Sequence, residues 1–410
     1  MSDSLSIKDE KLSSFCLNLL FFWFLTSAFV VWEPAPFDLL FPVVGFFLLT
    51  QSRPLQFPKE SRILFPSLLL FLLANLISLF FVEDIERALF YVTVTFYMLL
   101  LAIFISLLIM NFGYAVLRHI FLAYTSIAVI SAILATLGII KLLPSSLINT
   151  VTLYDRGCGF FKDPNVYAPY LVIPMIYSLH CCFNRHRIRI LWGIAALALI
   201  LGIFTAFSRA SWGASAVAVV GYFFLISLAE GRFSLFLKYM GYVFLLLAIS
   251  GTIVATFASE TNLSSFMTRR FAIQDYDSDR FAVQRAALES GLNHPFGIGP
   301  GHAERIFEKE ALRHTGATHS LYLRVFSETG ILGALSFLAI LFVTIRKSLL
   351  LCFKGIKQHR RLHCALAAAL GATLVNSFVI DSLHWRHLFV LIGIIWGVDI
   401  YNLWHRTRES

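Results

Sequence analysis

Arginines beside apolar segments are the first residues in this sequence whose position indicates chemistry. Arg209 stands in the short segment Phe207–Ser211 between two apolar runs, where a cation within a membrane costs at least a few kcal/mol unless a polar cavity or a partner surrounds it. Arg280 and Arg285 lie in a later polar stretch, and Arg156 lies in a shorter one. A guanidinium presents paired N–H groups that match a diphosphate. These positions predict an anion site, although Arg209 could also extend its charge to the surface and the others could belong to a solvated face.

One histidine follows the longer polar stretch. His319 lies between Thr318 and Ser320, directly before an apolar run. Histidine titrates near neutral pH and can accept a proton from a hydroxyl group; the alternative is an interfacial histidine that caps a helix. Glu328 lies about 13 Å further along a helix, so it cannot contact His319 within that helix. His319 is not part of an HExxH pattern, and no metal site is expected.

The composition places these residues in a membrane protein. Of the 410 residues, 58% are hydrophobic, 14% are charged and 41 are phenylalanine, and the mean hydropathy is +0.77. Soluble domains are usually about 45–50% apolar and about a quarter charged. The difference excludes a soluble enzyme, a disordered protein and a disulfide-stapled secreted domain. The net charge of +9 is attributed to loop topology, and no nucleic acid partner is expected.

Apolar runs that approach the length of a spanning helix, about 20 residues, recur along the chain. The twelve runs are 14–32, 35–50, 63–82, 88–110, 116–141, 166–183, 188–207, 210–229, 236–258, 320–345, 364–380 and 387–403. With the N-terminus inside, more than half of the 33 lysines and arginines lie beside short inner connections, as the positive-inside rule requires. We therefore predict an all-α polytopic membrane protein of about twelve transmembrane helices with both termini cytoplasmic. No cleavable signal peptide is expected, because residues 1–14 are polar and of mixed charge.

These runs divide the chain into three parts. Residues 1–258 carry the first nine predicted transmembrane helices, 259–318 form one large outer loop, and 319–410 carry the last three helices and a cytoplasmic tail. The outer loop is polar and contains helix-like stretches at 278–292 and 303–312. Functional residues gather on loops that a rigid scaffold holds, so the outer loop is expected to carry part of the active site.

Three further motifs lie on the same side of the predicted membrane. The Asp-Pro-Asn tripeptide 163–165 is typical of a turn or a helix start, with Asn165 as a polar lining residue. The run Pro295–Gly301 has GxGxG spacing but lacks the context of a dinucleotide site or a P-loop, and it predicts a rigid turn. Asp381 and Arg386 share the last outer turn, where a surface salt bridge is expected.

The order of these motifs resembles the O-antigen ligase and polymerase superfamily. The segments that carry the resemblance are Phe161–Asn165, Ser208–Ala210, Asp279-Arg280, His294–Gly301, His319–Leu323 and Glu328–Gly333. The similarity covers roughly 155–345 and is strongest from 279 to 333. Members commonly have a small residue before the loop arginine and Asn after the histidine, where this chain has Asp279 and Ser320. Because Asp279 could pair with Arg280, Arg285 remains a candidate, and Ser320 could bond at a helix start.

The resemblance implies a GT-C-like membrane glycosyltransferase that uses no cofactor, no nucleotide sugar and no metal. In this family, a glycan on undecaprenyl diphosphate is transferred with inversion to an acceptor hydroxyl, such as that of lipid A core. The reaction takes place at the periplasmic face of the bacterial inner membrane, among membrane lipids. The expected site residues are His319 as the catalytic base and, as substrate-binding residues, Arg209, Arg280, Arg285, Arg156 and Asn165.

Two other functions remain open from the sequence. A polymerase that joins two lipid-linked repeats would use the same donor and the same motifs. A transporter for a lipid-linked glycan would place ionisable groups near the bilayer midplane and break its helices there. The charges of the candidate site residues gather at the outer face, and 63–82 holds no ionisable residue. An enzyme of the ligase type is therefore favoured.

Overall fold

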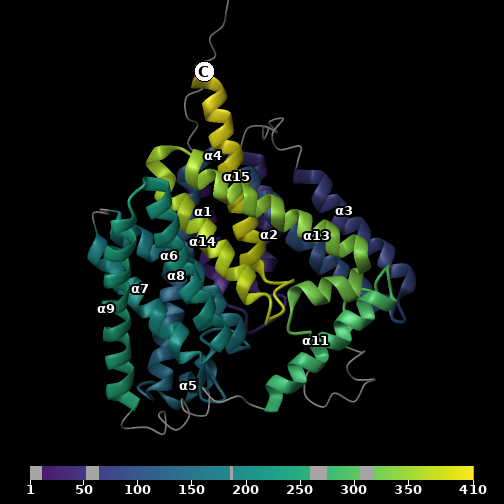
Figure 1. Ribbon diagram of the computed structural model, residues 1–410, viewed down its shortest axis with the longest axis horizontal. Coiled ribbons are helices and arrows are strands. Elements are labelled where there is room, and N and C mark those ends of the chain that lie inside the picture. The colour runs from purple at the N-terminus through teal and green to yellow at the C-terminus, as the bar shows by residue number, and fades with distance from the viewer. Residues whose placement is uncertain (1–11, 52–63, 185–187, 259–274, 305–317, 410) are drawn as a thin grey trace, which may run out of the picture.

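The computed structural model of the chain is a bundle of helices (Figure 1), and it describes residues 12–51, 64–184, 188–258, 275–304 and 318–409. The long helices are α1 (Ser14–Leu25), α2 (Pro36–Gln51), α3 (Leu64–Ser78), α4 (Ile85–Ile139), α6 (Pro164–Phe183), α7 (Arg189–Thr205), α8 (Arg209–Glu230), α9 (Phe233–Ala258), α13 (Leu321–Lys354), α14 (Arg360–Asn376) and α15 (Arg386–Glu409). The shorter elements are α5 (Ser145–Val151), α11 (Asp275–Asn293), the 3-10 turns η1 (Thr26–Ala28), η3 (Leu79–Phe81) and η4 (Lys357–His359), and the antiparallel strands β1 (Thr152–Leu153) and β2 (Arg156–Gly157). The predicted all-α class is confirmed.

The helices follow the predicted apolar runs, although their lengths differ. In the described part of the chain, α4, α6, α8, α13 and most of α15 are long and apolar enough to cross a membrane. Five shorter apolar segments correspond to α1, α2, α3, α7 and α9. The chain is therefore a multi-pass membrane protein, and the number of twelve crossings stays a prediction.

The connections between the helices gather at two ends of the bundle, which we call the loop face and the tail face. The loop face consists of segments 26–35, 79–84, 140–163, 206–208, 294–304, 318–320 and 377–385, which contact one another through backbone and side-chain hydrogen bonds. The tail face consists of Gly113, Asn184, 229–232, 355–363 and the last turns of α15. In Figure 1 the tail face lies near the label C, and α5 and α11 lie toward the opposite end.

Helix α4 consists of two arms that meet at Gly113. This glycine has φ +63° and ψ −147°, outside the helical region. A Cβ atom there would overlap the ring of Tyr401 in α15, so both the conformation and the contact require glycine. Arg87, near the start of α4, contacts the loop face, whereas Gly113 lies at the tail face. The arms correspond to the two runs predicted at 88–110 and 116–141.

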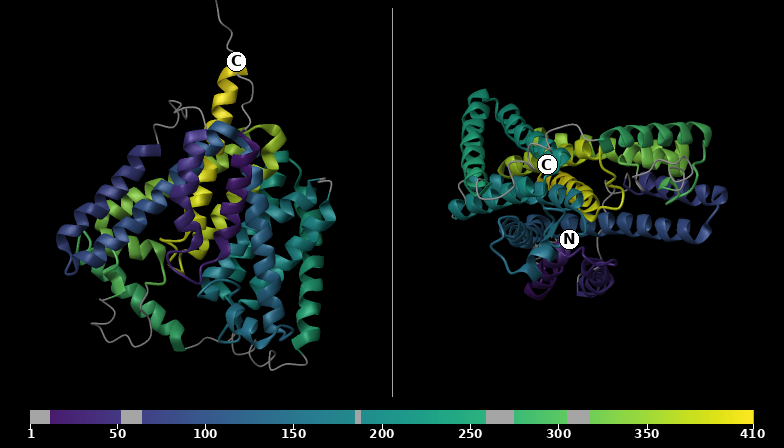
Figure 2. Two further views of the ribbon diagram at one scale, coloured as in Figure 1. Left: turned by 180° about the vertical axis from the view of Figure 1, so that it is seen from behind. Right: turned by 90° about the horizontal axis from the view of Figure 1, so that it is seen from below.

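The outside of the bundle is apolar, as a lipid environment requires. Phe46 of α2, Phe90 of α4 and Phe244 of α9 each expose about two-thirds of their surface, at 65%, 65% and 66%. Soluble monomers rarely expose large contiguous apolar patches. Inside, α15 packs along α4, and the two views of Figure 2 show α15 surrounded by the other helices. The bundle thus holds the loop-face segments on a rigid scaffold.

Candidate active site

His319 lies at the junction of three elements of the loop face. Its carbonyl oxygen accepts a hydrogen bond of 3.1 Å from Nε2 of Gln284 in α11. Two residues later, the N–H of Leu321 donates to the carbonyl of Ser377 at the end of α14, over 3.0 Å. The backbone of His319 is left-handed, with φ +49°, which costs a residue other than glycine about 1–3 kcal/mol. The hydrogen bonds from Gln284 and to Ser377 therefore hold His319 in a backbone conformation that an unconstrained chain would rarely adopt.

The surroundings of His319 favour its neutral form. Burial and, to a smaller extent, the nearby Arg280 guanidinium lower the pKa of the imidazole to about 4, while Asp381 and Asp163 act in the opposite direction. At neutral pH the ring is therefore uncharged and one of its nitrogens can accept a proton. The prediction placed His319 as a proton acceptor, and this environment is compatible with that role.

The structure separates the two arginines of α11. Arg280 is half-buried and near enough to His319 to affect its pKa. Arg285 is 81% exposed and its Nε pairs with Oε1 of Glu289, one turn along the helix, over 2.8 Å. The side chain of Asp279 lies outside the described part of the structure, so its expected pairing with Arg280 stays a prediction. Arg280 is the arginine of this helix that accompanies the histidine.

Arg156 links three segments next to the start of α8. Its Nε donates to the carbonyl of Ala206 and its Nη2 to Oδ1 of Asn165, each over 2.8 Å. Asn165 was expected to line the site; its side chain accepts the hydrogen bond from Arg156, and its place in a site stays a prediction. Ala206 precedes Phe207, whose φ of +48° turns the chain sharply into α8. Arg209 is the first residue of that helix and is half-buried.

Asp163 connects the two groups of residues. Its carboxylate accepts a hydrogen bond of 2.7 Å from the N–H of Asn165 and so caps α6. The same charge acts on the pKa of His319. The predicted helix start at 163–165 is confirmed. The structure thus brings Arg156 and Asn165 together, brings Arg280 and His319 together, and places Asp163 between the pairs.

The glycine-rich run Pro295–Gly301 binds the backbone of α13. Gly330 interrupts that helix with φ +67°, and the run fills the interruption: Gly299 N donates to Glu328 O over 3.0 Å, and Ile331 N donates to Pro295 O over 2.9 Å. A Cβ atom at Gly330 would overlap the carbonyl of Pro295. The predicted rigid turn is therefore a clasp that fixes the end of α11 to α13.

Sequence reasoning missed an ion-pair network behind His319. Arg324 Nη1 donates to Oδ2 of Asp381 over 2.5 Å, and its Nε lies 3.2 Å from Oε1 of Glu328. Asp381 was expected to pair with Arg386, but Arg386 pairs with Asp38 of α2 instead. The expectation was wrong because it considered neighbours in sequence, whereas α13 and α2 supply the partners. The i,i+4 spacing of Arg324 and Glu328 was the available signal.

Ser320 differs from its expected role in one respect. It is the residue that precedes the first turn of α13, but its side chain makes no capping hydrogen bond. It is buried, and its carbonyl accepts a hydrogen bond of 3.3 Å from the Thr318 hydroxyl. Residues 305–312 of the second predicted loop helix, at 303–312, lie outside the described residues.

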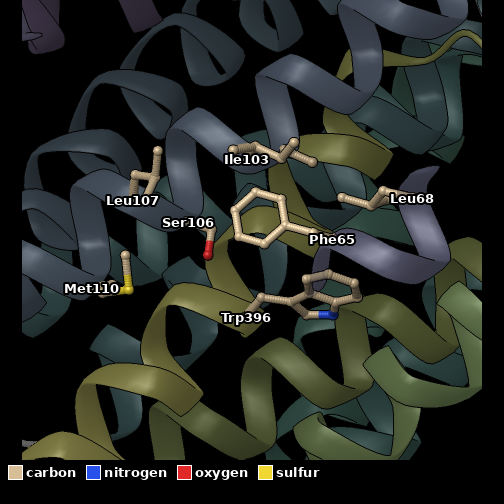
Figure 3. A pocket seen from close by; sticks show the side chains of 8 residues that line it. Phe65, Leu68, Ile103, Ser106, Leu107, Met110 and Trp396 are labelled. Atoms are coloured by element: carbon tan, nitrogen blue, oxygen red, sulfur yellow. The ribbon is translucent and has the colours of Figure 1, made fainter. Parts of the chain in front are cut away.

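Two cavities of the bundle differ in their position; the larger lies beside these residues, and none of them lines the smaller. The larger, of about 710 Å³, lies at the loop face between α4 and the starts of α2, α6 and α15, and Asp163 lines it. The smaller holds about 10 Å³ between α3, α4 and α15 (Figure 3), which is room for about one water molecule. Its walls are apolar apart from Ser106 and Trp396, and the Trp396 N–H donates to Thr344. Of these two cavities, the larger could hold part of a substrate. In the described ranges, no three His, Cys, Asp or Glu side chains gather to hold a metal ion.

Comparison with known protein families confirms the resemblance that the motifs predict. Residues 194–338 match the family model described as O-antigen ligase. The matched segment extends from α7 into α13 and includes Arg209, α11 and His319, whereas Arg156 and Asn165 precede it. No curated protein matches the chain. The match supports a place in the O-antigen ligase superfamily, and hence a membrane enzyme of the ligase or polymerase type.

Proposed function

We propose that this member of the O-antigen ligase superfamily transfers a polysaccharide from undecaprenyl diphosphate to a hydroxyl group of lipid A core. In this proposal the protein lies in the bacterial inner membrane with both termini in the cytoplasm and the loop face in the periplasm. The bias of lysines and arginines toward short inner connections supports that orientation. The reaction is metal-independent and inverts the anomeric carbon.

The environment of His319 is the observation that carries the proposal. Its imidazole is kept neutral by burial and by Arg280, and its carbonyl and its neighbours are held by α11 and α14. A neutral imidazole can accept the proton of the acceptor hydroxyl, and the nearby guanidinium supplies positive charge for a dianionic diphosphate ester. A helix-capping histidine would not require the left-handed backbone that His319 adopts.

The proposed reaction is one displacement. His319 takes the proton of the acceptor hydroxyl as its oxygen attacks the anomeric carbon of the donor glycan. A new C–O bond forms on one side of that carbon while the bond to the diphosphate oxygen breaks on the other. Undecaprenyl diphosphate leaves with the bonding electron pair, and Arg209 and Arg280 stabilise its additional charge.

Arg156 and Asn165 have a supporting part in this proposal. The Arg156 guanidinium binds the carbonyl of Ala206, and the turn at 206–208 leads into the first residue of α8, which is Arg209. Asn165 fixes the other end of the Arg156 side chain. We therefore assign to this pair the task of positioning Arg209 and adding positive potential at the diphosphate.

Transfer by the purified protein tests the proposal. The full chain is given undecaprenyl-diphosphate glycan with or without lipid A core, in the presence of EDTA, and the products are separated by mass. We expect glycan on the core only when core is added, and none from His319→Ala. The matched control is His119→Ala, because His119 lies on α4 and bonds only the carbonyl of Ala115 among the contacts described for it. Full transfer by His319→Ala would overturn the catalytic assignment.

The polymerase is the second candidate, because the family match covers ligases and polymerases alike. The same reaction mixture separates the two. Longer lipid-linked chains in the absence of core would identify a polymerase. Binding of the donor without any transfer, combined with its movement across a vesicle membrane, would identify a transporter.

A further inference from the structure

The cavity of about 710 Å³ at the loop face lies beside the proposed active site, and the proposed reaction does not assign it an occupant. Its walls come from the connection between α1 and α2, from the first half of α4, and from the starts of α6 and α15. Sites for small molecules usually measure about 300–1,000 Å³. The cavity is therefore large enough for a specific ligand of more than one ring.

Aromatic rings form one part of the wall. Tyr91, Tyr170 and Trp385 line the cavity together with Phe161. Rings of this kind offer flat apolar faces, and tyrosine and tryptophan add a polar edge. The rings of Trp385 and of the neighbouring His387 have their centroids 5.1 Å apart and are tilted by 40°, so they contact each other at an angle.

Polar groups form a smaller part of the wall, which is otherwise lined by apolar side chains such as those of Phe24, Val94 and Met98. Asp38 is paired with Arg386 and accepts a hydrogen bond of 2.8 Å from the Tyr97 hydroxyl. Lys162 lies 3.5 Å from Glu33 at the same cavity. A hydrocarbon chain against these groups would remove their water without replacing a hydrogen bond, which is costly. A ligand with many hydroxyl groups would keep them bonded.

His387 provides an independent sign of a polar ligand. It lines the cavity, and only 6% of its surface is exposed. Its Nε2 atom is buried and has no hydrogen-bond partner in the described part of the chain. Buried ring nitrogens nearly always have a partner. A hydroxyl group in the cavity would supply it.

The charges of the wall decide which of the two substrates fits. Three carboxylates, Glu33, Asp38 and Asp163, line the cavity, against the two cationic side chains of Lys162 and Arg386. This balance disfavours a diphosphate, which the Arg209 and Arg280 side of the loop face suits better. Asp163 lines the cavity and also lies near enough to His319 to affect its pKa, so one wall of the cavity lies toward the proposed base.

We propose that this cavity binds neutral sugar rings of the acceptor glycan, stacked on Trp385 and hydrogen-bonded to His387, and presents one hydroxyl group toward His319. The inference rests on the proposed function, because it names the acceptor side of the same reaction. It assigns the α1–α2 connection and the start of α15 to acceptor recognition, and the α8 and α11 side to the donor.

The test compares acceptor and donor kinetics in the full chain reconstituted in nanodiscs. The variants are His387→Phe, which keeps a flat ring but removes the nitrogen, and Trp385→Ala with Trp385→Phe as its conservative partner. The control is His359→Phe, because His359 stacks on Tyr114 at the tail face, where phenylalanine can also stack. We expect the acceptor KM to rise about tenfold in His387→Phe and Trp385→Ala, as loss of one good contact implies. Donor KM and kcat should stay near wild type, and Trp385→Phe should recover part of the loss.

Direct titration separates failure of this inference from failure of the proposed function. Core oligosaccharide freed from lipid A is titrated into each variant without donor, and undecaprenyl phosphate is titrated separately. Weaker binding of the oligosaccharide in the two cavity variants supports the inference even if the wild type transfers nothing. An unchanged acceptor KM with normal transfer, no oligosaccharide binding to the wild type, or weaker binding of undecaprenyl phosphate alone would overturn it.

Discussion

The two faces of the bundle differ in the surroundings of some of their basic side chains. At the tail face, Arg361 makes two hydrogen bonds with Glu230, of 2.6 and 3.0 Å, which neutralise it in place. At the loop face, Arg156 donates to two neutral oxygens, and Arg280 lies near an imidazole whose pKa it lowers. Ion pairs therefore join helices at both faces, as Arg324 with Asp381 does at the loop face, and the loop face also places a guanidinium near the neutral imidazole of His319.

The backbone shows the same contrast. At the tail face, the left-handed positions are the glycines 113 and 231. At the loop face, the left-handed residues also include Tyr154, Phe207 and His319. Glycine adopts this conformation without strain, whereas other residues do so at a cost that the fold must offset. Strain at a site that also concentrates charge is typical of a functional surface, and the contrast predicts that mutations will separate into losses of activity and losses of stability.

Histidine variants are expected to show the largest difference in kcat between the loop face and the tail face. His319→Ala should lower kcat by about 10²–10⁴-fold, the usual contribution of a general base, with donor binding unchanged. His359→Ala at the tail face should leave kcat of the folded protein near wild type, because His359 only stacks on Tyr114. Transfer assays and donor titration on the same preparations measure both. Equal losses of kcat in His319→Ala and His359→Ala would show that the two faces do not differ in their role in transfer.

The two glycine turns provide the second comparison. Gly330→Ala should destabilise the protein by more than about 1 kcal/mol, since its Cβ would overlap Pro295 O, and should also lower kcat, because the clasp fixes α11 to α13. Gly113→Ala should cost similar stability through Tyr401 but leave kcat of the folded fraction unchanged. Thermal unfolding and transfer assays measure the two effects.

The control for both glycine variants is Gly371→Ala. A Cβ there would meet no atom within 4 Å, and alanine is preferred in a helix by about 0.5–1 kcal/mol. This variant should therefore be as stable as the wild type or more so. A kcat loss in Gly113→Ala as large as that in Gly330→Ala would show that the clasp does not act on the site.

Arginine variants sharpen the comparison through the shape of the group. Arg209→Ala should raise the donor KM by about tenfold to a hundredfold, the loss of one charge-assisted contact. Arg209→Lys should lose less, because lysine keeps the charge but not the planar fork. At the tail face, Arg361→Lys should lower the unfolding temperature without changing the donor KM. Equal donor KM values for Arg209→Ala and Arg209→Lys would indicate that only the fork matters.

The pH dependence reports on the same environment with smaller effects. His319 must be neutral to accept a proton, so kcat/KM should be constant near neutral pH and fall as the pH decreases through about 4. Since Arg280 lowers this pKa and Asp381 raises it, Arg280→Gln should move the acid limb to higher pH and Asp381→Asn to lower pH. Glu289→Gln should leave the acid limb unchanged, because Glu289 pairs with Arg285 and is not among the groups that act on His319. Shifts of the opposite sign would contradict the arrangement.

The same shift affects stability with a definite sign. An unfolded histidine has a pKa near 6.5, whereas folded His319 has one of about 4. Between these values the unfolded chain binds more protons, so the free energy of unfolding falls as the pH decreases from about 6.5 toward 4. The stabilising contribution is complete above that range, and His319→Ala should weaken this dependence in unfolding measured against pH.

Hydropathy predicted the scaffold well, because each apolar run must bury or face lipid whatever its neighbours are. The turn at Gly113 falls in the gap between two predicted runs, and the helix start at Asp163 follows from capping chemistry alone. Contacts between distant segments could not be predicted in the same way. Asp381 finds Arg324 in another helix, and the turn at 295–301 finds the interruption at Gly330. Sequence spacing contains no information on which elements become neighbours.

The two arginines of α11 show why sequence spacing cannot identify contacts between elements. One of them also gives the smallest change in donor KM that we expect. From the sequence, Arg280 was the preferred candidate for the diphosphate, and Arg285 remained a candidate because Asp279 could pair with Arg280. The structure pairs Arg285 with Glu289 on an exposed surface, where an ion pair contributes about 0–1 kcal/mol. Arg285→Ala should therefore change donor KM less than about twofold, whereas Arg280→Ala should raise it severalfold. If Arg285→Ala has the larger effect, α11 must rotate or shift when donor binds, and the pairing of Arg280 with His319 would describe the protein only without donor.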